Sequence, residues 1–189
     1  MRKNEKKDIC LSIAKCLYAG AQEVPDWENP IVVGINKEPY HATLTLPSQK
    51  ADCKEIISLN GKWRFQWSAD PGKRPADFYK NDFNTDTWDT ITVPGAWQLQ
   101  GYGKPIYSNV NYPFQKDAPK VTSEPPAEYY SYGHRNPTGS YVTTFEVTPD
   151  MKDKCLYLHF EGVKSAMYVW VNGERVATAR IRCRLPSLT

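Results

Sequence analysis

The 189-residue chain has no stretch approaching the roughly 18 uninterrupted apolar residues of a transmembrane helix, so we expect no membrane span. It contains no C-x-x-C pair, no Gly-rich phosphate loop, no G-x-S-x-G and no H-E-x-x-H. These absences argue against zinc, nucleotide, serine-hydrolase and zinc-protease chemistry. No carboxylates form an obvious pair of the kind that a glycosidase places across its scissile bond. We therefore expect no metal site and no complete catalytic set.

The net charge of +3 is unevenly distributed along the chain. Residues 1–21 hold five basic and two acidic side chains, and residues 177–189 hold three arginines and no acid. Residues 22–176 hold 16 basic against 19 acidic side chains. A nucleic-acid groove needs a basic face on the folded body. The mildly acidic body therefore predicts no nucleic-acid partner.

The first 21 residues are similar to a secretory signal peptide. A basic start is followed by the apolar stretch Ile9–Ala14 and by Ala19-Gly20-Ala21, an A-x-A cleavage pattern. Lys15 and the early acids weaken the pattern. We expect an exported protein, periplasmic or secreted. The alternative is an N-terminus with no targeting role and a cytoplasmic location.

Only two of the five cysteines, Cys53 and Cys155, belong to the body of the chain. We expect two unpaired buried thiols there, because free cysteine behaves as a small apolar residue. One disulfide between them is the alternative.

Strand patterns dominate the body, and they predict an all-β sandwich. Residues 22–57 lack periodicity and predict an extended N-terminal arm, with Trp27 as its apolar anchor. In the first strand, Trp63, Phe65 and Trp67 alternate with polar residues. Pro75–Phe83 suggests one helical turn. The six expected strands are Ser58–Ser68, which is this first strand, Thr90–Pro94, Ser140–Val147, Cys155–Phe160, Met167–Val171 and Glu174–Val176, the last two joined by an Asn172-Gly173 hairpin turn.

The loop Trp97–Pro113 is the most promising binding feature. It combines the aromatic residues Trp97, Tyr102 and Tyr107 with side-chain amides such as Asn109. Aromatic faces pack against sugar rings, and amides both donate to and accept from hydroxyls. The composition suits carbohydrate contact. Equally, the aromatics could simply hold a Gly- and Pro-rich loop against the sandwich.

A series of short motifs runs in order over roughly residues 22–176. They are Asp26-Trp27-Glu28-Asn29-Pro30, Asn36-Lys37-Glu38-Pro39 with His41-Ala42, Ser58-Leu59-Asn60-Gly61-Lys62-Trp63, Gly101-Tyr102-Gly103-Lys104-Pro105-Ile106-Tyr107-Ser108-Asn109-Val110 with Tyr112-Pro113, Asn136-Pro137-Thr138-Gly139-Ser140-Tyr141, Phe160-Glu161-Gly162-Val163-Lys164-Ser165-Ala166 and Tyr168-Val169-Trp170-Val171-Asn172-Gly173. In content and order these motifs resemble the N-terminal region of glycoside hydrolase family 2 β-galactosidases. One departure is Pro94-Gly95-Ala96-Trp97, where the family more often has Ser-Asn between Pro and Trp.

This resemblance implies a jelly-roll sugar-binding domain, of the galactose-binding-domain type, over residues 58–176. In the family, immunoglobulin-like domains and a barrel follow, and the barrel holds both catalytic glutamates. The resemblance gives Asn109 as the residue that contacts galactose, beside Val110, with Trp97, Tyr102 and Tyr107 as loop walls. The family enzymes use magnesium and sodium, whose ligands are absent from this chain, and they are oligomeric. A bacterial source is also implied.

The tail departs from the family pattern after Val176. The family continues Gly-Tyr, two further residues, Asp-Ser and Leu-Pro, and its aspartate binds substrate and sodium. Here Ala-Thr-Ala-Arg-Ile-Arg-Cys-Arg follows instead. Deleting one G from GTA GGC TAC AGC CAG GAT TCG CTG CCG, which encodes a family-like run, produces the codons for Val176–Arg184. We therefore hypothesise that residues 177–189 are an aberrant, frameshifted tail. Natural divergence is the alternative.

Together these observations predict the sugar-binding domain of a β-galactosidase, cut off before the barrel and inactive alone. A free-standing carbohydrate-binding module and a non-functional pseudogene product are the alternatives. A jelly roll has about eight strands, of which the sequence indicates about six. We therefore expect uncovered edges, an incomplete C-terminal side and marginal stability.

Overall fold

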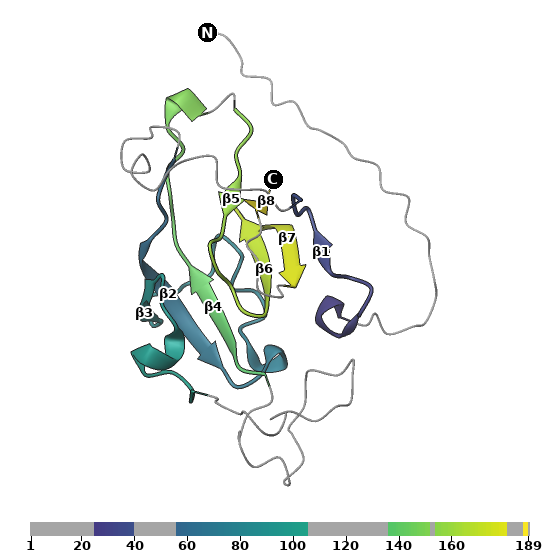
Figure 1. Ribbon diagram of the computed structural model, residues 1–189. Coiled ribbons are helices and arrows are strands. Elements are labelled where there is room, and N and C mark those ends of the chain that lie inside the picture. Colours follow the sequence, from purple (N-terminus) through teal and green to yellow (C-terminus); the bar gives the residue numbers. More distant parts are fainter. Residues whose placement is uncertain (1–24, 40–55, 106–135, 152–153, 181–186, 189) are drawn as a thin grey trace.

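The computed structural model describes residues 25–39, 56–105, 136–151, 154–180 and 187–188 (Figure 1). Within this part of the chain there are two three-stranded antiparallel sheets, one two-stranded pair, short 3-10 helices and no α-helix. The all-β prediction is therefore confirmed, and the antiparallel sheets agree with a β-sandwich. The jelly-roll connectivity stays a prediction. No described helix is long and apolar enough to cross a membrane.

The first sheet has the order β3-β2-β4, comprising β3 (Asp89–Val93), β2 (Gly61–Ser68) and β4 (Thr138–Val142). β2 pairs with both neighbours, and Phe65 lies opposite Tyr141 of β4. Side chains two residues apart share a face of a strand. The alternating aromatics of β2 therefore share one face, and Phe65 at its centre is fully buried. This strand confirms the prediction for Ser58–Ser68, with a start at Gly61.

The second sheet has the order β1-β7-β6, comprising β1 (Gly34–Ile35), β7 (Glu174–Arg180) and β6 (Ala166–Val171). Asn172 and Gly173 join β6 to β7 with φ angles of 52° and 89°. Positive φ at both central residues is the geometry of a type I′ hairpin turn, so the predicted hairpin is confirmed.

β7 runs past the end predicted for the domain. The sequence places that end at Val176, but the strand continues to Arg180. Ala177, Thr178 and Ala179 are all buried, and Gly34 of β1 pairs with Ala179. Small side chains are easily buried in a sheet, so the first residues of the unusual tail serve as strand residues here.

The arm approaches β6 and β7 through one short 3-10 helix, η1 (Asp26–Glu28). The Arg175 side chain pairs with the Asp26 carboxylate, and the Arg180 guanidinium donates to the Asp26 carbonyl oxygen. The Trp27 ring meets Tyr168 edge-on, with centroids 5.8 Å apart, and Arg74 lies 4.8 Å above the Trp27 ring. These contacts confirm Trp27 as an anchor of the arm.

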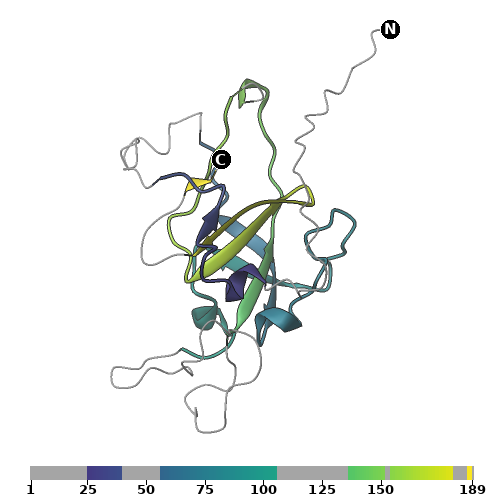
Figure 2. The same ribbon diagram turned by 90° about the vertical axis from the view of Figure 1, so that its right-hand side faces the viewer.

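The two sheets form two layers: they lie next to one another in Figure 1, and in Figure 2 the sheet of β6 and β7 lies in front of the sheet of β2 and β4. The segment between β2 and β3 connects them through aromatic rings. Tyr79 stacks on Trp170 of β6, with centroids 5.2 Å apart and planes 8° apart. Phe78 contacts both Trp170 and Trp88. The buried apolar side chains of the described residues are Phe65, Trp88, Ile91, Met151, Ala177 and Ala179.

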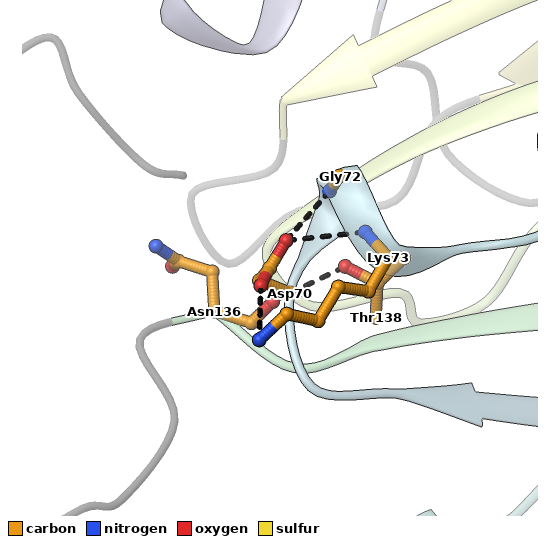
Figure 3. A network of polar contacts seen from close by, with 5 residues as sticks. All are labelled: Asp70, Gly72, Lys73, Asn136 and Thr138. Atoms are coloured by element: carbon orange, nitrogen blue, oxygen red, sulfur yellow. Dashed lines mark hydrogen bonds and ion pairs between the residues drawn. The ribbon is translucent and has the colours of Figure 1, made fainter. Parts of the chain in front are cut away.

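A capped turn follows β2. Asp70 precedes the 3-10 helix η3 (Pro71–Lys73), and its Oδ1 accepts from the backbone N–H groups of Gly72 at 2.8 Å and Lys73 at 3.2 Å. Figure 3 shows this cap beside the turn where the Thr138 hydroxyl donates to the Asn136 carbonyl at 3.2 Å. An aspartate N-cap satisfies helix N–H groups that otherwise lack partners.

Four further predictions differ from the structure. The strand predicted over Ser140–Val147 is instead β4, which begins at Thr138 and ends at Val142. The strand predicted over Cys155–Phe160 is reduced to β5 (Leu158–His159), which pairs with β8 (Ser187–Leu188). Cys155 is an exposed free thiol, which corrects the prediction of a buried one. Its place before the shortened strand accounts for the exposure. Residues 75–83 form turns instead of a helical turn, and the nearest 3-10 helix lies at η3.

Candidate functional site

The predicted sugar loop begins directly after β3 with the 3-10 helix η4 (Trp97–Gln100). Gly101 ends this helix in the left-handed region, with φ of 97°, a conformation that favours glycine. The Tyr102 N–H donates to the Trp97 carbonyl at 3.1 Å. The helix and its cap therefore bring Trp97 and Tyr102 close together.

Both aromatic walls pack on the first sheet. The Tyr102 ring meets Phe65 at 4.7 Å in an edge-on arrangement, and the Trp97 ring lies 6.2 Å from Phe65. Trp97 and Tyr102 are half-buried. Of the two interpretations open from the sequence, these contacts support aromatics that hold the loop against the sheet. Neither residue is fully buried, so each leaves some surface for a further contact.

Gly139 of β4 makes this packing possible. A Cβ at Gly139 would lie 2.7 Å from both Phe65 Cε2 and Trp97 Cζ3, and 2.8 Å from Tyr141 Cε2. Carbon atoms pack optimally at about 3.5–4.0 Å. Only glycine lets the three rings converge here, which gives a physical role to the glycine of the Asn-Pro-Thr-Gly motif.

A second contact fastens the loop to β3. The Gln100 side chain accepts from the Thr92 N–H at 2.8 Å through Oε1, and donates to the Thr92 carbonyl at 3.0 Å through Nε2. Sequence reasoning missed this contact. Gln100 was visible only as one of several amides near the aromatics, and nothing in the sequence pairs it with Thr92.

Burial is the main cause of the raised pKa values of two tyrosines at the site, Tyr102 and Tyr141. Burial, together with a hydrogen bond to the Asp89 carboxylate, raises the pKa of Tyr102. Burial raises the pKa of Tyr141 to about 12. Both phenols therefore stay neutral near pH 7 and can act as hydrogen-bond donors. Neither is prepared to act as a base.

The remaining predicted site residues, Tyr107, Asn109 and Val110, lie outside the described residues. Among the residues that the structure does describe, no three His, Cys, Asp or Glu side chains gather as metal ligands.

A separate polar hollow, which the sequence did not suggest, lies in the segment between β2 and β3. It has a volume of about 340 Å³ and is lined by Asp77, Lys80, Asp82, Phe83 and Asn84. Lys80 Nζ pairs with Asp77 at 3.2 Å, and both side chains are more than half exposed. The Asp77 carboxylate raises the pKa of Lys80. The hollow is open to solvent, and the buried side-chain atoms without a partner among the described residues lie elsewhere.

The sequence of this region belongs to a known class of domain. Residues 56–187 match the family model described as "Glycosyl hydrolases family 2, sugar binding domain". The match covers more than half of the chain, so the chain belongs to this glycosyl hydrolase family and carries its sugar-binding domain.

The chain is also similar to named β-galactosidases. It is 40% identical over 168 residues to the one of Priestia megaterium (strain DSM 319 / IMG 1521), covering 84% of this chain and 16% of that protein. It is 38% identical over 167 residues to the one of Vibrio vulnificus (strain CMCP6), covering 86% of this chain and 15% of that protein. It is 40% identical over 158 residues to the one of Clostridium acetobutylicum, covering 80% and 17%. The chain therefore spans about a sixth of the length of these relatives.

Proposed function

We propose that this chain is the sugar-binding N-terminal part of a β-galactosidase that hydrolyses terminal β-galactosides, and that it does not hydrolyse them alone. The family match and the three β-galactosidase relatives support this proposal. The aromatic loop adds a contact surface, since neither Trp97 nor Tyr102 is fully buried.

In this proposal the chain binds and orients sugar, and acid–base chemistry comes from elsewhere in the longer enzyme. A retaining glycosidase uses two carboxyl groups about 5–5.5 Å apart, one as nucleophile and one as acid and base. We assign that pair, the magnesium and sodium sites and the oligomer contacts to the parent enzyme. Asn109 and Val110 are the proposed galactoside contacts of this chain, and export through residues 1–21 is its proposed route.

Two measurements on the purified chain test the proposal. Incubation with a chromogenic β-galactoside should release no product, whereas product formation would refute the proposal that the chain is inactive alone. Titration calorimetry with lactose should give weak binding that Asn109→Ala reduces and that Asn60→Ala, outside the loop, leaves unchanged. Tight binding would favour a free-standing carbohydrate-binding module. Absence of binding would refute a sugar-contact role for this chain alone.

The proposed frameshift has a separate test in the gene. The DNA that follows the codon for Val176 should continue, in another reading frame, into family domains. If no frame does so, a naturally diverged C-terminus is the correct explanation of residues 177–189.

A further inference from the structure

Gln100 occupies the outer edge of β3 in the way that a neighbouring strand would. β3 is an edge strand, because its one neighbour among the described strands is β2. Thr92 lies opposite Lys62 in that pairing. Its N–H and C=O are both bound to Gln100 and therefore point away from β2. A side-chain amide carries one donor group and one acceptor, as a backbone peptide does, so the two hydrogen bonds close a ring.

The position of Gln100 within η4 links this edge contact to the aromatic walls. Gln100 is the last residue of the helix that begins at Trp97. Leu99 N–H bonds to the Ala96 carbonyl, and Tyr102 N–H bonds to the Trp97 carbonyl, each at 3.1 Å. Fixing Gln100 on β3 therefore limits how far the short helix and its cap can rotate. That limit restricts the orientation of both rings above Phe65.

We propose that Gln100 is a positioning residue, which holds Trp97 and Tyr102 in one orientation for contact with a galactoside. This inference rests on the proposed function of the loop. It predicts a role that is separate from global stability, because the contact lies on the exposed edge of the sheet. It also explains why a loop that the sequence marks as Gly- and Pro-rich begins with an ordered helix.

The test uses Gln100→Ala with Leu99→Ala as a matched control. Leu99 belongs to the same helix, and its side chain is 85% exposed. Hydrogen exchange of single backbone amides, followed by NMR, reports directly on the Thr92 N–H bond to Gln100 and on the Tyr102 N–H bond to Trp97. In Gln100→Ala the Thr92 amide should exchange about five- to tenfold faster, as expected for the loss of one net hydrogen bond. The Tyr102 amide should accelerate with it, and Leu99→Ala should change neither.

Gln100→Glu supplies a second signature. The carboxylate keeps an acceptor for the Thr92 N–H, but its other oxygen repels the Thr92 carbonyl. Below the ordinary carboxyl pKa of about 4.3, the protonated group can donate again. Protection at Thr92 and Tyr102 should therefore recover as the pH falls in this variant. The wild-type chain and Leu99→Ala should show no such recovery.

Lactose titration of the same variants connects the contact to sugar binding. If the competent ring orientation falls to about a tenth to a third of the population, the apparent Kd of Gln100→Ala rises about three- to tenfold. Leu99→Ala should bind as the wild type does. Acceleration at Thr92 with unchanged exchange at Tyr102 would overturn the inference, because Gln100 would then only cap the sheet edge. An unchanged lactose Kd in Gln100→Ala, despite faster exchange of the Thr92 and Tyr102 amides, would also overturn the inference. In a third outcome, Gln100→Ala accelerates exchange at both Thr92 and Tyr102 while the wild-type chain binds no lactose. That result would refute the proposed function, and with it the sugar role of Gln100, but the contact between Gln100 and the ring-bearing helix would stand.

Discussion

Gly139→Ala is the substitution that tests the packing of the loop most directly. The added methyl group would lie 2.7 Å from Phe65 and Trp97 and 2.8 Å from Tyr141. All three neighbours are aromatic side chains, and Phe65 is fully buried. A ring atom at this distance has to retreat by roughly an ångström to reach ordinary contact. Three rings cannot retreat together without opening the packing between the loop and the sheet.

The expected cost of Gly139→Ala follows from this overpacking. Inserting one extra methyl group into a well-packed site costs about 1–3 kcal/mol. Contact with three rings places the value at the upper end of that range, about 2–3 kcal/mol. At a typical m value of about 2 kcal/mol per M urea, the unfolding midpoint should fall by about 1–1.5 M. Loosening of Trp97 should also increase the exchange rate of the Tyr102 amide.

The assay is urea unfolding followed by tryptophan fluorescence, with Gly162→Ala as the control. A Cβ at Gly162 meets no atom within 4 Å, and its φ is not in the positive range. That variant should be neutral or more stable, since alanine lowers the entropy of the unfolded chain. A midpoint for Gly139→Ala that equals the control would refute the argument that Gly139 is required by the three rings.

Three further outcomes are expected. Ser140→Ala should raise the free energy of unfolding by about 1 kcal/mol, because the buried Ser140 hydroxyl has no hydrogen-bond partner among the described residues. A lower free energy of unfolding in urea denaturation would contradict this. Trp27→Ala should cost about 2 kcal/mol and make the arm sensitive to protease, since its ring contacts Tyr168; unchanged digestion would contradict arm docking. Burial raises the pKa of Tyr141 to about 12, above the unfolded value of about 10. The neutral phenol therefore stabilises the fold fully below pH 10, and stability should fall as the pH rises from 10 through 12. Tyr141→Phe should reduce this slope in alkaline unfolding experiments, and an unchanged slope would contradict the assignment.

The local features of this fold could be predicted from sequence. The alternating aromatics of β2 and the Asn172-Gly173 turn act through neighbours in the chain, and both appear in the structure. The register of β7 with β1 could not be predicted, because it depends on residues that are more than 130 positions apart. The prediction that Cys155 is buried was wrong for a related reason. That a residue is cysteine says nothing about where the neighbouring strand begins.

The candidate site shows the same division. Composition identifies an aromatic and amide loop, and the resemblance supplies Asn109 and Val110. The Gln100 contact with Thr92 and the approach of three rings to Gly139 depend on tertiary geometry. A glutamine and a glycine carry no periodic signal. Their roles become visible only once β3, β4 and the loop lie together.

The pairing of β1 with β7 has a consequence for the order of assembly during synthesis. Asp26 and Arg180, which are joined by a hydrogen bond, are 154 residues apart in the chain. The arm leaves the ribosome well before its partner strand β7, whose residues follow it by about 145 positions. β1 therefore has no partner strand until β7 has been made, and pairings between such distant segments form slowly. The arm is made before β6 and β7, yet it can complete the second sheet only after β7 has been made.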